Sequence, residues 1–442
     1  MEGHRKRLAV LLAVAAALSA VVVTSAIAHS VKSGAGTLNI YGYGPGDDVQ
    51  ENRAKYAAGV LSSTNVNRPA GDFNDQVFLA RLASGDVPDL VRMSRPRVAQ
   101  YASKGVLQPM DSCVKSVKKQ YRAGAMNAMT YKGHVYGLPE FTNQITLIVN
   151  NDVARAAGVA VADIQTTNLK KLKQANKKLL KVENGRVTRI GFDPKLPEFF
   201  PLWVKRYGAN LISRDGLHAQ LNSRQAVAAL AYSVGLINDH GGWDKFKAYR
   251  DTLDYFGRIN PMSGNAMGAT PFESFIYNVW AEGAPVDITA KYFTNQKGGP
   301  ISMISGNAWA IPRGSQNPGL ACKFVKAMQS VNAWTTVAKA RFDLRKRQGR
   351  AFTGLYTANT KADVKIYEDI YQPMGNKQFD DAVTLLVRAP RYAFAIPLSP
   401  ASTEFRQAWT EAVNRVLEGR QTPRQALDQA QKEAQAAINK AK

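Results

Sequence analysis

The sequence contains few of the residues that build metal clusters or disulfide-rich folds. Its 442 residues include only two cysteines, Cys113 and Cys322, and five histidines. No two histidines have the spacing of zinc ligands, so we expect no metal site. Two cysteines so far apart in sequence cannot form a disulfide scaffold. We expect two buried thiols in separate lobes, and one disulfide in an oxidising compartment is the alternative.

Motifs of the common nucleotide-binding and hydrolytic enzymes are missing as well. The chain has no P-loop and no Gly-x-Ser-x-Gly elbow. The turn Gly42-x-Gly44-x-Gly46 begins like a dinucleotide fingerprint, but Asp47 stands where the third glycine belongs. Acidic residues are scattered along the chain, and nothing marks two of them as a glycosidase pair. We therefore expect no enzymatic activity and no cofactor.

Long hydrophobic runs are absent except for one near the N-terminus, which excludes a multi-span transporter. Basic residues at 5–7 precede an apolar run at 8–23, and small residues follow at Ala26 and Ala28. These features predict a secretory signal peptide over residues 1–28. An uncleaved anchor is the alternative, since residues 8–28 together make 21 residues, long enough to span a membrane. In either case we expect a periplasmic or extracellular protein, and no cysteine follows the run to carry a lipid.

Acidic residues are strongly outnumbered by basic ones. The chain has 58 Lys and Arg against 34 Asp and Glu, a net charge of +24, and removing the leader's three basic residues and Glu2 leaves +22. For an exported protein the natural counterparts are anionic lipids, wall polymers or acidic ligands, and we expect no nucleic acid. The basic clusters are short, so a solvated basic surface is the simpler interpretation.

The first part of the mature chain alternates between strand and helix signals. We expect strands at 37–41 and 88–93, a helix from an N-cap at Asp72 to Gly85, and another at 96–105. This order predicts an α/β fold with a parallel sheet and right-handed crossovers. Ligands of such sheets bind beyond the carboxyl ends of the strands.

The remainder is predicted to form a hairpin, a helical insert and a return of strands. The hairpin covers 131–139 and leads into a strand at 145–149, and residues 152–257 are predicted to be mostly helical. Further strands are expected at 265–270, 286–288 and 302–311. The chain is then helical, with an apolar stripe over 405–417 and a capping box at Thr422–Gln425 that begins a last helix.

Four sequence blocks resemble one family. They are Pro88–Asp111 (PDLVRMS…YASKGVLQPMD), Tyr131–Asp152 (YKGHVYGLP…LIVNND), Ser305–Ala327 (SGNAWAIPRGSQN…) and Leu417–Leu427 (LEGRQTP…AL). In this order they resemble the family-1 extracellular solute-binding proteins of ABC importers, in particular the maltose-binding-protein-like sugar receptors. The absence of a lipid-anchor cysteine departs from much of that family.

The resemblance implies a two-lobed, type II-like periplasmic-binding-protein fold, each lobe a mostly parallel sheet flanked by helices. Three crossovers form the hinge, expected near Phe141, Asn260 and Pro312. The N-lobe would comprise 36–141 plus 262–312, and the C-lobe 142–261 plus 313–442 with the C-terminal helices. The implied function is to clamp a saccharide between the lobes and deliver it, as a monomer, to permease subunits in the membrane.

Candidate ligand contacts come from the strand ends and from the family's contact loops. The strand ends contribute Tyr43, Asp47, Ser94 and Arg95. The loops that the resemblance points to contribute Glu140, Phe141, Asn143, Glu198, Phe199, Phe272, Glu273, Ser305, Gly306, Asn307 and Phe405. The four phenylalanines could equally belong to the core. Arg95 is either a contact for an acidic sugar or a surface charge, whereas Trp203, Trp243 and Trp280 are assigned to the core.

Two other functions remain open at this stage. The positive charge is compatible with a cell-surface protein that binds polyanions or glycans. The scattered carboxylates leave room for a secreted glycan-degrading enzyme. A solute receptor would show saturable, stoichiometric binding without turnover, an enzyme would consume its substrate, and polyanion binding would weaken steeply with salt.

Overall fold

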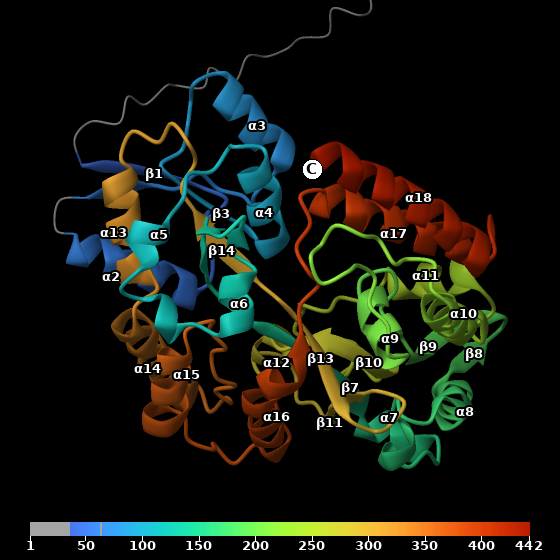
Figure 1. Ribbon diagram of the computed structural model, residues 1–442. Helices are drawn as coiled ribbons and strands as arrows, with labels where there is room; N and C mark the ends of the chain where they lie inside the picture. The colour runs from blue at the N-terminus through green and yellow to red at the C-terminus, as the bar shows by residue number, and fades with distance from the viewer. Residues whose placement is uncertain (1–35, 62–63) are drawn as a thin grey trace, which may run out of the picture. The chain divides into compact units, whose positions relative to one another are not determined.

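In the computed structural model, which describes residues 36–61 and 64–442, the strands form two main sheets and one short hairpin (Figure 1). Residues 36–442 form one compact unit. The predicted signal peptide or anchor at 1–28 lies outside the described residues. No helix in the described part of the chain combines the length and the apolarity needed to cross a membrane.

The first sheet has the strand order β2-β1-β3-β14-β6. Strand β1 is parallel to β2 and β3, and β14 runs antiparallel to β3 and β6. The sheet therefore contains both parallel and antiparallel strand pairs, because the chain returns to it through β14. Its bounds are β1 Thr37–Tyr41, β2 Asn65–Asn67, β3 Leu90–Ser94, β6 Leu138–Pro139 and β14 Asn307–Ala310, while β4 Thr130–Tyr131 and β5 His134–Val135 form the hairpin.

Helices pack on the first sheet around a core that includes Leu38, Leu90 and Trp309, all fully buried. Asn74, and not the expected Asp72, caps α3, because the Asn74 side chain accepts hydrogen bonds from the first-turn amides of Gln76 and Val77. The helices are α2 Asp48–Val60, α3 Asp75–Ala83, α4 Arg95–Ser103, α5 Asp111–Val114, α6 Ala123–Asn127 and α13 Pro318–Met328, with a 3₁₀ turn at Lys118–Gln120.

The two cysteines form a disulfide between α5 and α13. Their Cα atoms are 5.8 Å apart although 209 residues separate them in sequence. Our expectation of two separate thiols is therefore wrong. Residues 318–328 were assigned to the C-lobe, but α13 packs on the first sheet, which brings Cys322 beside Cys113.

The second sheet has the order β12-β13-β7-β10-β9-β8, with β11 beside β7 and β15 beside β13. Two predictions differ from it. Residues 152–257 were predicted to be mostly helical, but they also contain β8 and β9. Strands β10 to β13 belong to this sheet rather than to the N-lobe. The bounds are β7 Asn143–Asn150, β8 Lys181–Glu183, β9 Arg186–Phe192, β10 Met267–Glu273, β11 Ile288–Lys291, β12 Phe293–Thr294, β13 Pro300–Ser305 and β15 Ala393–Phe394.

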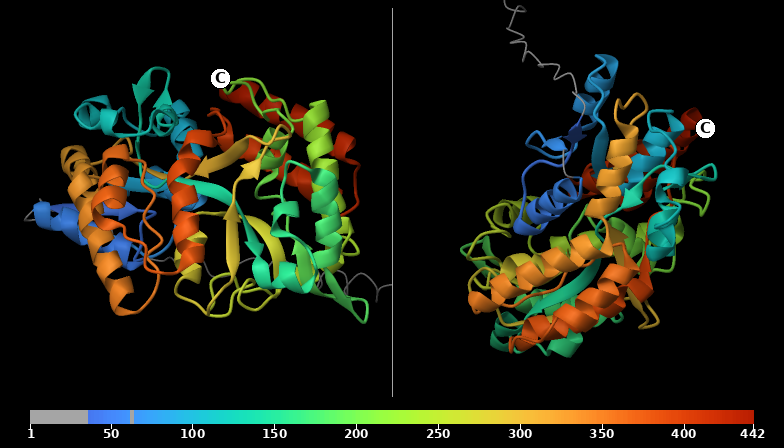
Figure 2. Two further views of the ribbon diagram at one scale, coloured as in Figure 1. Left: turned by 90° about the horizontal axis from the view of Figure 1, so that it is seen from below. Right: turned by 90° about the vertical axis from the view of Figure 1, so that its left-hand side faces the viewer.

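The helices of the second sheet enclose the larger core. Trp203 and Trp280 are buried in it as expected, whereas Trp243 is half-buried. The capping box at Thr422–Gln425 is confirmed, and Figure 2 shows the two C-terminal helices side by side. The helices are α7 Asn151–Ala156, α8 Leu169–Leu179, α9 Phe200–Arg206, α10 Arg224–Asn238, α11 Trp243–Arg250, α12 Phe275–Trp280, α16 Lys377–Arg388, α17 Ser402–Leu417 and α18 Pro423–Ala441, with 3₁₀ turns at Val161–Asp163 and Ala389–Tyr392.

A third cluster lies against the first sheet's helices. It is formed by α14 Val331–Arg347, α15 Thr360–Lys365 and the π-turn Ile366–Ile370, with Trp334 and Phe342 packing near Val49 of α2. Within residues 36–61 and 64–442 the chain therefore crosses between the lobes three times, at 140–142, at Gly306 and at 371–376. The first crossover is at Phe141 as expected. The second, at Gly306, lies six residues before the expected Pro312. No described crossover lies near Asn260, because β10 to β13 stay with β7, and the third, at 371–376, was not expected.

Candidate functional site

The candidate site lies where the two sheets are joined by their first two crossovers. On one side of Gly306, Ser305 of β13 pairs with Asn143 of β7. On the other side, Asn307 of β14 pairs with Ser94 of β3. Two short backbone connections thus bring together four polar residues that were predicted from separate parts of the sequence. All four are half-buried, so part of each remains accessible.

Glu273 joins this group from the end of β10. Its Oε1 accepts a hydrogen bond of 2.6 Å from the Ser305 hydroxyl. The register of β10 against β7 sets Glu273 opposite Ile145, two residues from Asn143. The ends of β3 and β10 therefore contribute polar side chains to the same junction, as ligand sites at strand ends require.

Glu140 has a different role from the one predicted. It is fully buried, and its two oxygens accept hydrogen bonds from Arg53 at 2.7 Å and Arg92 at 2.5 Å. Burial alone would raise the pKa of Glu140, but Arg92 and Arg53 outweigh it and hold that pKa below its ordinary value. In the amide orientation that places the Asn307 side-chain oxygen toward Arg92, this oxygen accepts a hydrogen bond of 2.8 Å from Nη2 of Arg92. Glu140 therefore fixes the hinge rather than facing a ligand.

Arg95 also belongs to the hinge. Only 5 % of it is exposed, and its Nη2 donates to the Phe141 carbonyl and, at 3.3 Å, to the Thr142 hydroxyl. Its backbone N–H donates to the Gly306 carbonyl at 3.1 Å. Burial lowers the pKa of its guanidinium to about 10. Arg95 thus ties two crossovers together, which is neither of the roles considered from the sequence.

Phe141 and Gly306 are packed against these same groups. The Phe141 ring meets Trp334 edge to face, with centroids 5.0 Å apart. Gly306 has a φ of +153°, and a Cβ there would collide with the Phe141 carbonyl. The close approach of the two crossovers therefore requires glycine at this position.

Tyr43 and Asp47 follow β1 but face different surroundings. Tyr43 is only 1 % exposed, donates its hydroxyl to the Gln50 carbonyl at 2.8 Å and packs against Trp309. Burial raises its pKa. Asp47 caps α2 by accepting from the Gln50 N–H, and its largely exposed carboxylate pairs with Arg341 at 3.0 Å. Of the two, only Asp47 offers an accessible polar group.

The loop after β9 brings a second set of charges to the end of that strand. Arg250 bonds the Asp193 carboxylate at 3.0 Å through Nε and Glu198 at 2.8 Å through Nη2. Glu198 is exposed, as a ligand contact would be. Phe199 and Phe405 are instead buried in the core of the second sheet.

Lys195 and Tyr255 were missed from the sequence. The Lys195 ammonium lies 4.0 Å from the centroid of the Tyr255 ring and 4.4 Å from that of Phe272. The predicted aromatic contact Phe272 therefore has a cation over its ring. The signal that could have found Lys195 is the strand Arg186–Phe192, because its recognition would have made the following loop a strand-end loop.

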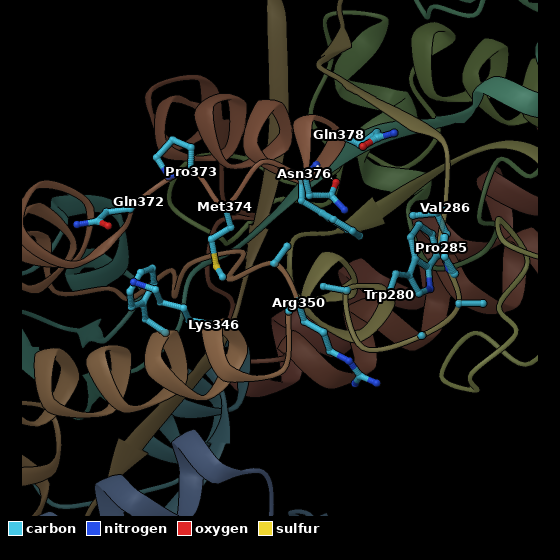
Figure 3. Close-up of a pocket in the computed structure, with 17 residues that line it drawn as sticks. Trp280, Pro285, Val286, Lys346, Arg350, Gln372, Pro373, Met374, Asn376 and Gln378 are labelled. Carbon is cyan, nitrogen blue, oxygen red and sulfur yellow. Dashed lines mark hydrogen bonds between the residues drawn. The ribbon is translucent and has the colours of Figure 1, made fainter.

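Two cavities lie away from this junction. One of about 710 Å³ borders the third crossover and is lined by the end of α14 and the loop after α12 (Figure 3). Another of about 680 Å³ lies between α4, α6 and residues 395–400. None of the predicted contact residues lines either cavity. The described residues also contain no group of three or more His, Cys, Asp and Glu that could hold a metal ion.

Sequence comparison assigns the family. The profile described as "Bacterial extracellular solute-binding protein" matches residues 64–332, more than half of the chain. The chain belongs to this family. The crossovers, the paired strands at Gly306 and the mixed sheets described above are therefore features of a solute-binding protein.

Two curated relatives come from Bacillus subtilis (strain 168). The chain is 22% identical over 290 residues to the arabinooligosaccharide-binding protein, covering 63% of this chain and 64% of that protein. It is 22% identical over 264 residues to the maltodextrin-binding protein MdxE, covering 57% and 59%. The matched part thus spans somewhat less than two thirds of each relative.

Solved structures of similar fold cover more of the chain. A structure described as CpMnBP1 with mannotriose bound superposes with a TM-score of 0.73 at 22% identity and covers 90% of this chain and 99% of that one. The ABC substrate-binding protein Lmo0181 from Listeria monocytogenes, in complex with cycloalternan, gives 0.72 at 20% identity, covering 91% and 98%. At these identities the likeness shows the two-lobed fold.

Proposed function

We propose that this protein is the substrate-binding component of an ABC importer and binds an oligosaccharide between its two lobes. The observation that carries the proposal is the pairing of Ser305 with Asn143 and of Asn307 with Ser94 on either side of Gly306. It supports a site to which both lobes contribute hydrogen-bonding groups. A solute that touches both lobes favours the arrangement in which they are close together.

The chemistry of the junction suits a sugar. A saccharide presents many hydroxyl groups and flat C–H faces, and proteins bind it with amides, carboxylates and aromatic rings. Asn143, Asn307 and Glu273 are the amides and the carboxylate near the crossovers, and Tyr255 contributes a half-buried ring. The relatives named for arabino-oligosaccharides and maltodextrin, and the structures with bound oligosaccharides, support this solute class.

The remaining parts of the function follow from the same proposal. The protein is exported and passes the solute to membrane permease subunits without altering it chemically. A dissociation constant in the micromolar range needs only about −8 kcal/mol of binding free energy. A few buried hydrogen bonds and one sugar stacked on an aromatic ring can supply that amount.

A ligand screen with two readouts tests this proposal. The melting temperature of the protein should rise saturably with the concentration of at least one neutral or acidic oligosaccharide. Chromatography should recover that sugar unchanged after long incubation. Loss of the sugar would favour a glycan-degrading enzyme. Stabilisation only by polyanions, abolished by high salt, would favour the polyanion-binding alternative. Absence of any effect from every saccharide would contradict the proposal.

A further inference from the structure

Lys195 is a buried cation with no ion pair to a described carboxylate, although Asp193, Glu198 and Glu273 act on its charge at longer range. Only 8 % of the residue is exposed, and it lies in the loop that follows β9. Among residues 36–61 and 64–442, no carboxylate oxygen lies within 4.0 Å of its ammonium group, and no described residue accepts a hydrogen bond from it. The Tyr255 and Phe272 rings are its close neighbours. A buried ammonium normally has an ionic partner, because its desolvation is costly.

The nearby carboxylates are already engaged by other groups. Asp193 and Glu198 are both bonded by Arg250, and Tyr255 donates to Asp193 at 3.4 Å. Glu273 accepts from Ser305. Arg250 therefore offsets part of the acidic charge at this strand end, and the close contacts of the Lys195 ammonium are the two rings, with the carboxylates acting on it only at longer range.

The backbone holds Lys195 in this position. Its φ is +54°, a left-handed conformation that is uncommon for a residue with a side chain. Its N–H donates to Oδ1 of Asp193 at 2.7 Å, which fixes the turn. The burial of the side chain also lowers the pKa of Lys195, so an anion next to it would favour its charged form.

We propose that Lys195, with Tyr255 and Phe272, forms a subsite for the carboxylate of an acidic sugar, so that the preferred solute is an oligosaccharide containing hexuronic acid. This inference rests on the proposed function and narrows its solute class. A hexuronic acid carries its carboxylate one bond from the pyranose ring. The anion can therefore meet the ammonium while the ring's C–H face meets an aromatic side chain. Glu273, one residue from Phe272, is available to accept a sugar hydroxyl.

The charge of the whole molecule favours the same solute. The mature chain has a net charge of +22 if the predicted leader is removed. A positive field of this size attracts anionic ligands and raises their association rate at low salt. That long-range effect is separate from the local contact at Lys195, so salt dependence and mutation can be measured independently.

Titration calorimetry with matched ligands tests the inference. The ligands are an oligogalacturonate and the same oligomer with its carboxylates methyl-esterified, which differ mainly in charge. We expect the wild-type protein to bind the acid at least about 10-fold more tightly, since hydrogen bonds to charged groups contribute about 1.5–3 kcal/mol. Lys195→Met should remove most of that preference and leave the ester's affinity within about two-fold. Lys195→Arg should retain it in part.

Lys245→Met is the matched control, because Lys245 is an exposed lysine of α11 in the same lobe. It should leave the preference unchanged. The inference is overturned if the acid and its ester bind equally well to the wild-type protein, or if both methionine variants lower the preference alike. If Lys195→Met does not fold, the inference is still tested by comparing the acid with its ester on the wild-type protein and on Lys195→Arg. Failure of the proposed function looks different, since then no saccharide, acidic or neutral, binds at all.

Discussion

Arg341 of α14 donates a hydrogen bond from Nη1 to Oδ1 of Asn278 in α12 at 3.0 Å. The two helices belong to different lobes, so this bond joins the lobes outside the backbone crossovers. The same guanidinium holds Asp48 at 2.6 Å and Asp47 at 3.0 Å through its other nitrogens. One arginine, 2 % exposed, therefore links the turn after β1 to the second lobe.

Substituting Arg341 or Asn278 should separate the ion pairs of Arg341 with Asp47 and Asp48 from its hydrogen bond to the second lobe. Arg341→Met leaves Asp47 and Asp48 without their cation and should lower the free energy of unfolding by about 1–3 kcal/mol. Asn278→Ala keeps those ion pairs and should cost less than about 1 kcal/mol, while changing how readily the lobes separate. Urea unfolding measures the first quantity and small-angle scattering the second. Equal destabilisation by both variants would contradict this division of roles.

The pair Glu140–Arg92, with Arg53, should make the first lobe sensitive to acid. Because its folded pKa is below the ordinary value of 4.5, Glu140 stabilises the fold fully above that pH, and the contribution is lost as pH falls through the folded pKa. Glu140→Gln should cost about 3–5 kcal/mol at neutral pH, since it leaves the buried Arg53 and the half-buried Arg92 without their anion. The difference in the free energy of unfolding between the variant and the wild-type protein should decrease below pH 4.5.

Glu51→Gln is the control for that measurement. Glu51 pairs with Arg68 near the surface, so its loss should cost about 1 kcal/mol or less. The two series are compared by urea unfolding at several pH values. A Glu140→Gln variant as stable as Glu51→Gln at neutral pH would show that the buried triad does not hold the hinge.

The disulfide Cys113–Cys322 should stabilise the first lobe without affecting the ligand contacts. Replacing both cysteines with serine, or reducing the native protein, should lower the free energy of unfolding by about 2–4 kcal/mol. Sugar affinity should stay within about two-fold, because neither cysteine lies at the crossovers. Thiol labelling before and after reduction checks the bond itself. Two thiols that react in the unreduced unfolded protein would contradict the pairing.

Gly306 should tolerate no side chain. Gly306→Ala places a Cβ against the Phe141 carbonyl and close to the Arg95 guanidinium, so we expect a loss of about 3 kcal/mol or more. Gly105→Ala is the matched control, since Gly105 also has a positive φ, of +68°, but no described atom beyond its chain neighbours lies within 4 Å of the place its Cβ would take. It should cost about 1–2 kcal/mol. Equal costs would mean that the contact between the crossovers is not tight.

Local signals in the sequence predicted much of the fold. The strand at 37–41 and the capping box at Thr422–Gln425 were found because each has a short-range physical signature. Strand Arg186–Phe192 was missed because it follows the lysine-rich helix α8 and has few apolar residues at its start. The lobe division failed at β10 to β13, since the choice of sheet depends on pairing with β7, which is a tertiary contact.

The site residues that lie at strand ends could be predicted from local sequence signals, whereas those defined by tertiary contacts could not. Ser94, Asn143 and Ser305 were chosen as strand-end or loop residues, and the structure brings them together through strand register. Glu140 and Arg95 were misread because their partners, Arg53 and the Phe141 carbonyl, are distant in sequence or belong to the backbone. Lys195 carried no local signal once its preceding strand was missed.

Small-angle scattering of the protein during titration with an oligosaccharide that stabilises it measures the central motion directly. The radius of gyration should fall saturably as the lobes close on the bound sugar, with the same midpoint as the calorimetric titration. A scattering profile that stays constant while the sugar binds stoichiometrically would contradict closure of two lobes on a shared solute.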